Sequence, residues 1–187
     1  MYKCMFFKKK EKTEIKKWHW WAFGIIILLT IAVNLYAYYW PQAHMQIAGR
    51  EIKVLVADTD KHRLKGMGGH GDFGTAGGLL FAFPHFGIHT MVMRDMKIPL
   101  DMVWIVTAPD NDGCWAGSWF RQLFFGIRPV CKGVVVEIAP NVQPEPGKPD
   151  FELTKYFTAK DSTMVLELPA GWTGENGLKI GDSISVY

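Results

Sequence analysis

Four charged residues in or beside strongly apolar stretches are the part of this sequence best suited to chemistry. Asp101 lies within the run IPLDMVWIV, and Glu167 lies within TMVLEL. Arg94 and Asp95 come shortly before the first of these runs. A buried acid has to find hydrogen-bond donors or a cation, because an unpaired carboxylate is very costly inside a protein. These four residues are therefore the candidate binding residues of the chain.

The three acids among them allow two interpretations. In the first, Asp95, Asp101 and Glu167 brace loops by accepting hydrogen bonds from backbone N–H groups. In the second, they converge in a polar site where a raised pKa would suit general acid–base catalysis. Alternation along a strand places Asp101 on the face of Val103 and Glu167 on the face of Val165. A binding site and an acid–base enzyme both remain open.

Other motifs with a chemical meaning lack the context that they need. GMGGHG (66–71) matches a dinucleotide-binding pattern, but that pattern follows a strand and opens a helix, whereas here a helix is expected before it. His85 and His89 are four residues apart, and on a strand this spacing is about 13 Å, too far for one shared metal ion. We therefore predict no metal site and no cofactor.

The elements that would position these residues are mostly short strands. Two further segments differ from them: 58–67 predicts a short helix that begins at Asp58 or Thr59, and 169–177 predicts a turn or one helical loop. Many strands without a repeating strand–helix alternation favour a mainly β fold, an antiparallel sandwich or barrel-like domain with one or two short helices. The predicted strands are 51–57, 79–83, 89–93, 98–106, 134–139, 163–168 and 184–187.

The first forty residues have a different character. No Lys, Arg, Asp or Glu occurs between Lys17 and Arg50, and 22–40 is almost continuously apolar. About 20 helical residues cross the hydrocarbon core of a bilayer, and tryptophans and tyrosines at the two ends are typical of membrane interfaces. We therefore predict a transmembrane helix over 18–40, although a cleaved signal peptide is the alternative. Residues with the small side chains that cleavage requires are poorly spaced, which favours an uncleaved anchor.

The distribution of charge predicts the topology. Residues 1–20 carry seven lysines and two glutamates, a net charge of +5, whereas the remainder carries 14 basic and 16 acidic residues, a net charge of −2. The positive-inside rule keeps the lysines in the cytoplasm and places the C-terminal domain outside it, at the cell membrane. Because the folded part has no basic excess, we predict no nucleic-acid partner.

These observations divide the chain into four parts. We predict a basic cytoplasmic tail over 1–17, a transmembrane helix over 18–40, a linker over 41–49 and an extracytoplasmic β-rich domain over 50–187.

Two cysteines and an aromatic segment belong to the predicted outer part. Cys114 and Cys131 lie in a compartment that permits a disulfide, and we favour this bond over two free thiols. The segment between them either packs on its own domain or forms an exposed lobe that contacts a membrane or a partner. Its apolar residues recur at helical spacing and include Trp115, Trp119, Phe120, Leu123 and Phe124.

The order of several motifs resembles the domain of unknown function 192 family. The resemblance covers about residues 51–187 and rests on IKVLVADTDKHRLKGM, GGLLFAF, MVMRDMKIPLDMVWI, VVEIAPNVQPEP, VLELPAG and LKIGDSI. It implies a compact, mainly β fold that is often exported or tethered to a membrane, and it implies no established activity. Against that family, 110–131 looks like an insertion.

We therefore expect a single-pass membrane protein that presents a small ligand-binding or interaction domain outside the cytoplasm. Its partners would be the lipid bilayer, through 18–40, and an envelope protein or a small-molecule ligand. One alternative is a membrane-tethered hydrolase or other acid–base enzyme that uses Asp95, Asp101 and Glu167. The other is a structural subunit of an envelope complex, held through the aromatic lobe.

Overall fold

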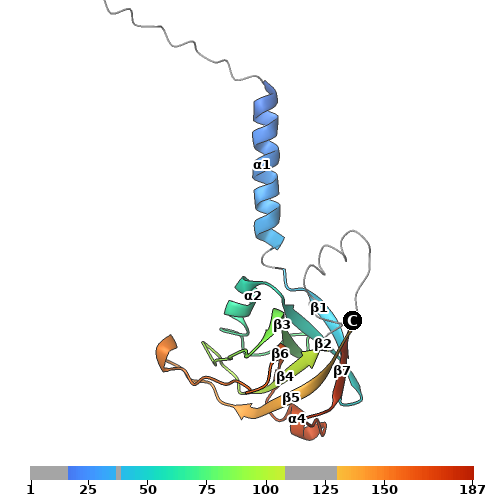
Figure 1. Cartoon of the computed structure of the whole chain (residues 1–187). Helices are drawn as coiled ribbons and strands as arrows, with labels where there is room; N and C mark the ends of the chain where they lie inside the picture. The colour runs from blue at the N-terminus through green and yellow to red at the C-terminus, as the bar shows by residue number, and fades with distance from the viewer. Residues whose placement is uncertain (1–16, 37–38, 108–129) are drawn as a thin grey trace, which may run out of the picture. The chain divides into compact units, whose positions relative to one another are not determined.

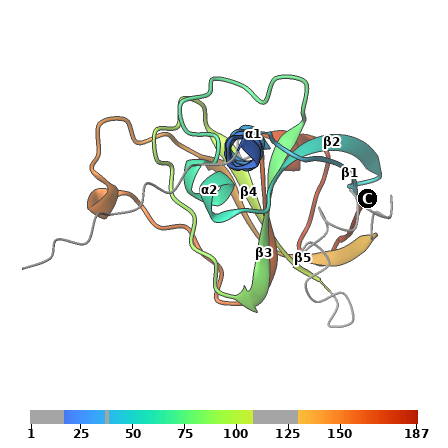
Figure 2. The ribbon, with the colours of Figure 1, turned by 90° about the horizontal axis from the view of Figure 1, so that it is seen from above.

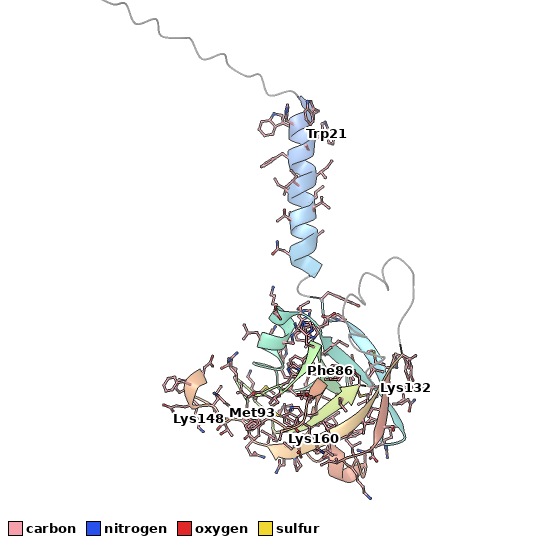
Figure 3. All side chains as sticks on the ribbon, in the orientation of Figure 1. Trp21, Phe86, Met93, Lys132, Lys148 and Lys160 are labelled. Atoms are coloured by element: carbon pink, nitrogen blue, oxygen red, sulfur yellow. The ribbon has the colours of Figure 1, made fainter. Side chains whose placement is uncertain are left out.

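The computed structural model of this chain describes residues 17–36, 39–107 and 130–187, which divide into two units between Tyr39 and Trp40. The first unit contains the helix α1 (Lys17–Tyr36), from which Trp21 projects with 77% of its surface exposed (Figure 3). Among the described residues, no helix combines the length and the apolar character needed to cross a membrane. The transmembrane helix predicted over 18–40 is therefore not confirmed.

The described residues of the second unit form a closed barrel of seven strands (Figure 1). Neighbouring strands pair in the order β1-β2-β3-β6-β4-β5-β7, and β7 pairs with β1 to close the ring. This confirms the prediction of a mainly β, barrel-like domain. The strands are β1 (Gln42–Ile47), β2 (Arg50–Ala57), β3 (Gly78–Gly87), β4 (Leu100–Thr107), β5 (Cys131–Val142), β6 (Ser162–Pro169) and β7 (Ser183–Val186).

One strand pair corrects the prediction of an antiparallel fold. The strands β2 and β3 run parallel, whereas the other pairs of the barrel are antiparallel. A parallel pair needs a crossover connection, which here consists of α2 (Asp60–Lys65) and the glycine-rich segment 66–77. Thr59 caps α2, as the sequence allowed, because its side chain accepts a hydrogen bond from the backbone N–H of His62 at 3.2 Å.

Two other predicted segments differ from the structure. The predicted linker 41–49 contains β1, which turns into β2 through Ala48 and Gly49 at φ values of 49° and 72°. Two consecutive residues with positive φ are typical of a two-residue hairpin, and this turn was not recognised in the sequence. The predicted strand 89–93 is a loop that makes a single bridge, between Met91 and Tyr156.

Short helical turns lie in the connections that follow. The segment between β5 and β6 contains the 3-10 turn η2 (Asp150–Glu152), and β6 leads into α4 (Trp172–Glu175), which lies within the predicted 169–177 loop. The predicted insertion 110–131 lies almost entirely outside the described residues, apart from Val130 and Cys131. We call the segment 143–161, which connects β5 to β6, the arm.

The barrel has two apolar cores, one on each side of its wall. The inner core receives side chains from all seven described strands, such as Met45, Val56, Ile105 and Leu166. The outer core lies against β3, β4 and β6 and is covered by the loops 66–77 and 88–99. Figure 2 shows α2 and these connections gathered on one side of the barrel, beside β3. The strands β3, β4 and β6 are therefore buried on both faces. The outer core comprises Ala57, Met67, Phe73, Leu79, Phe81, Met91, Met93, Met96, Leu100, Met102, Trp104, Val142 and Val165.

Candidate functional site

Glu167 is a buried acid on the outer face of the barrel wall. It lies near the end of β6, paired with Leu79 of β3 and Met102 of β4. Its neighbours Leu166 and Leu168 belong to the inner core, so alternation directs the Glu167 side chain outwards. Only 3% of Glu167 is exposed, and its buried Oε2 has no hydrogen-bond partner among the described residues. A buried polar atom without a partner is unusual and requires an explanation.

Burial changes the protonation of this carboxyl group. Removal from water disfavours the charged form and raises the pKa of Glu167 from 4.5 to about 8. Glu167 is therefore mostly neutral at pH 7. In that form the carboxyl group offers an O–H donor as well as an acceptor oxygen.

Glu167 lines a cavity of about 360 Å³, which we call the Glu167 pocket. The pocket lies between α2, the loop 88–99 and the outer face of β3 and β6. Its size is at the lower end of the range of small-molecule sites. Its lining combines apolar side chains with charged ones: Asp60, Arg63, Leu64, Lys65, Met67, Phe81, Phe83, Thr90, Met91, Val92, Arg94, Met96 and Glu167, with the backbone of Gly66.

Two arginines of the pocket are held by different parts of the domain. Arg94 donates from Nε to Asp150 Oδ1 of the arm at 2.8 Å, and its side chain remains about one-third exposed. Arg63 of α2 donates to the backbone carbonyl of Ala82 at 2.7 Å and to Asp60 Oδ1 at 2.6 Å. The arm and α2 thus place two guanidinium groups at a pocket whose lining includes an acid with an unpartnered oxygen.

The beginning of the loop that carries Arg94 is held by two neighbouring parts of the domain. The indole N–H of Trp104 donates to the carbonyl of His89 at 2.9 Å, and the backbones of Met91 and Tyr156 exchange two hydrogen bonds of 2.7 and 2.9 Å. His89 also stacks on Phe83 with ring centroids 3.6 Å apart. The loop 88–99 is thereby attached to β4 on one side and to the arm on the other.

Asp101 lies on the opposite side of the barrel wall from Glu167, and both of its carboxylate oxygens have hydrogen-bond partners. It shares the face of Val103 and Ile105, which belong to the inner core. Its Oδ1 accepts from the backbone N–H of Asn141 at 2.8 Å and of Gly171 at 3.0 Å, and its Oδ2 accepts from the N–H and hydroxyl of Thr173 at 2.8 and 2.6 Å. Asp101 therefore braces the connection from β6 to α4.

Burial and hydrogen bonding act on the pKa of Asp101 in opposite directions. Burial alone would raise it, but the hydrogen bonds from Thr173, Asn141 and Gly171 outweigh burial and hold the pKa below its usual value. The carboxylate is thus charged and fully engaged at neutral pH. It is not available for the acid–base role considered from the sequence.

Asp95 is exposed and lies at a strained position beside the pocket. Its φ is 53°, and its carbonyl accepts a hydrogen bond from the N–H of Gly69 at 2.9 Å. It borders a neighbouring hollow with Gly68 and Gly69, which shares Arg94 with the Glu167 pocket, but Asp95 itself does not line that pocket. The structure thus brings Arg94 and Glu167 to one pocket, and it places Asp101 and Asp95 elsewhere.

Several pocket residues were missed in the sequence. Arg63 was read only as part of a helix, although it supplies a second guanidinium. Met67, Met91 and Met96 come from loops that cover the barrel, and no periodic pattern marks such residues. Their methionine side chains were the available signal, because methionine is common at adaptable binding surfaces.

Two other predicted features lie largely outside the described residues. Cys131 is fully buried at the beginning of β5, but its predicted partner Cys114 is not described. The aromatic lobe with Trp115, Trp119, Phe120, Leu123 and Phe124 is also outside the described residues. Within the part that is described, no three His, Cys, Asp or Glu side chains gather as a metal site.

Comparisons with known proteins agree with the family resemblance. Residues 43–109 match the model of the DUF192 family, which is described as Uncharacterized ACR. The resemblance is thereby supported. The match includes Arg63, Arg94, Asp95 and Asp101 but ends before Glu167. No curated protein matches the chain.

Two solved structures are similar in fold. A candidate transcription regulator from Sinorhizobium meliloti 1021 aligns with a TM-score of 0.56 and 20% identity, over 80% of this chain and 95% of its own. A protein of unknown function from Novosphingobium aromaticivorans DSM 12444 aligns with a TM-score of 0.53 and 20% identity, over 78% and 84%. At this identity the likeness concerns the fold alone.

Replacing Asp101 with Asn should destabilise the barrel. The variant side chain would turn an N–H₂ group towards donors, and we expect the free energy of unfolding to fall by about 3 kcal/mol. Since the pKa of Asp101 is lowered, the wild-type advantage should be full above the usual value of 3.8 and fade as the pH falls below it. Urea unfolding measures both effects. The exposed Asp161→Asn is the control, and equal losses in the two variants would contradict the bracing role.

Replacing Glu167 with Gln should change how stability depends on pH. Because the folded protein keeps a proton that the unfolded chain releases, wild-type stability should fall as the pH rises from 4.5 to about 8. The slope reaches up to about 1.4 kcal/mol per pH unit. Glu167→Gln should remove this fall, as measured by urea unfolding across that range. If both proteins had the same slope, Glu167 would not be a buried neutral acid.

Proposed function

We propose that this protein is tethered to a membrane by its N-terminal segment and binds a small ligand in the Glu167 pocket of its barrel domain. One observation carries the ligand-binding part: Glu167 is buried in the wall of a cavity, and its Oε2 has no partner among the described residues. Leaving a buried polar group unpaired costs about 1–3 kcal/mol. A ligand that supplies the missing hydrogen bond would recover this free energy.

The composition of the pocket supports a ligand rather than packing alone. Its walls are apolar and include Phe81 and Met91, whereas a few polar groups converge on it from α2, β6 and the loop 88–99. Small-molecule sites usually have this combination of apolar walls and a few placed polar groups. A purely structural contact would need no unpartnered acid in its lining.

The membrane tether is supported by the surface of α1 and by the charge that precedes it. Apolar side chains on the described part of the helix are largely exposed, with Ile26 at 59% and Leu28 at 67%. A continuous apolar surface of this kind is rare on soluble proteins and is typical of surfaces that contact a membrane or a partner protein. With the lysines of 1–17 in the cytoplasm, the barrel would lie outside it.

The disulfide between Cys114 and Cys131 belongs to the same proposal. Cys131 is fully buried at the beginning of β5, as disulfide-bonded cysteines commonly are, which supports a bond to another cysteine. The oxidising side of the membrane would maintain that bond.

Ligand binding can be tested with the full chain in lipid nanodiscs, with its methionine methyl groups labelled for NMR. A mixed library of small acids, amides, alcohols and amines should contain compounds that shift the signals of Met67, Met91 and Met96. The signals of Met45 and Met164, which lie in the inner core, should not move.

Thr90→Trp provides a blocking variant, because Thr90 is exposed and lines the pocket. It should abolish the shifts, whereas Thr75→Trp, at an exposed position away from the pocket, should preserve them. A library without any compound that shifts the pocket methyl groups would contradict the proposed ligand-binding function.

The tether predicts that the barrel remains with the membrane fraction after a high-salt wash. Ile26→Glu combined with Leu28→Glu should release it, because each charge in a membrane helix costs about 3 kcal/mol. The same changes at Ile88 and Ile180, which are exposed on the barrel, should not. Retention of the first variant or salt release of the wild type would refute the anchor. In protein denatured from the same membranes, a maleimide should label one cysteine without reduction and all three after reduction, because denaturation exposes the buried Cys131.

A further inference from the structure

The charges around the Glu167 pocket have mostly one sign. Arg63, Lys65 and Arg94 line it, and the two acids that pair with the arginines, Asp60 and Asp150, are exposed. Glu167 adds little negative charge at neutral pH, because burial raises its pKa to about 8. A cationic ligand would have to pass three positive side chains, whereas an anion would be attracted by them.

Arg94 is the better placed of the two arginines for contact with an anion. It bonds to Asp150 through Nε, and no other hydrogen bond joins it to the described residues. Its two terminal nitrogens therefore remain available as a pair of parallel donors, the arrangement that binds a carboxylate in bidentate fashion. The bond to the arm also fixes the guanidinium group before a ligand arrives. Arg63, in contrast, already donates two hydrogen bonds, to the carbonyl of Ala82 and to Asp60.

The interior of the pocket favours an apolar body. Phe81, Met67, Met91 and Met96 are buried side chains that line it. Methionine side chains adapt to ligands of different shape. The volume of about 360 Å³ limits the ligand to a small molecule.

We propose that the ligand of the Glu167 pocket is a small organic anion with an apolar body. Its acidic group would bind the guanidinium of Arg94 beside the positive charge of Arg63 and Lys65, its apolar body would contact Phe81 and the methionines, and neutral Glu167 would donate a hydrogen bond to it. This inference rests on the proposed ligand-binding function.

Three compounds of one shape test the sign of the ligand charge: cinnamate, cinnamamide and cinnamylamine. They share a phenylpropenyl body and differ in a negative, a neutral and a positive end group. Each is titrated into the full chain in nanodiscs, with the methyl signals of Met67, Met91 and Met96 as the measurement. Cinnamate should bind at least about tenfold more tightly than the other two, a difference of about 1.4 kcal/mol.

Variants locate the groups responsible. Arg94→Gln should weaken cinnamate binding about tenfold without affecting cinnamamide, whereas the exposed Arg50→Gln on β2 should change neither. Raising the pH from about 6 to 9 should weaken cinnamate binding in the wild type, because ionised Glu167 repels an anion. Glu167→Gln should remove this pH dependence, since an amide cannot ionise.

The outcomes separate this inference from the function on which it rests. If cinnamamide or cinnamylamine shifts the pocket methyl groups as strongly as cinnamate, the pocket binds ligands but does not select anions, and the inference is wrong. An unchanged cinnamate affinity in Arg94→Gln overturns it as well. If none of the three compounds shifts the signals, the inference also fails, and the wider library then decides whether the pocket binds any ligand.

Discussion

Burial of the strands β3, β6 and β4 on both faces is the constraint on which the rest of this domain depends. The inner faces of these strands close the barrel core, and their outer faces carry a second core under the loops 66–77 and 88–99. Two-sided burial explains why their sequences are apolar on both faces. It also means that any polar side chain on them, whichever way it points, must be satisfied inside the protein.

Asp101 meets this requirement, whereas Glu167 does not. They lie on adjacent, paired strands but on different sides of the wall, since Asp101 pairs with Leu168 and Glu167 with Met102. Asp101 accepts four hydrogen bonds and remains charged, whereas Oε2 of Glu167 has no partner among the described residues and burial keeps the carboxyl group protonated. The difference arises from the surroundings. Backbone N–H groups of Asn141, Gly171 and Thr173 point at Asp101, whereas the outer face beside Glu167 opens into a cavity.

The sequence correctly predicted those features that depend only on neighbouring residues of the same strand. Period-two alternation predicted most strands and assigned Asp101 and Glu167 correctly to the faces of Val103 and Val165. It could not indicate that these faces lie on opposite sides of one wall, because that depends on pairing between β4 and β6. The pocket was beyond prediction for the same reason: Arg63, Arg94 and Glu167 are brought together by a parallel crossover, a loop and a strand that are remote in sequence.

The position of Glu167 argues that the pocket is more than an imperfection of packing. Val165 and Met102 on the same outer face are fully buried apolar residues, so an apolar side chain at position 167 would remove the unpaired polar atom without disturbing the strand pairing. The carboxyl group instead lowers stability by about 1–3 kcal/mol. Unfavourable local arrangements of this kind gather at binding and catalytic sites, where a ligand or reaction uses them. The arm reinforces this argument, because it holds Arg94 at the same cavity through Asp150 and thereby keeps a second polar group in place.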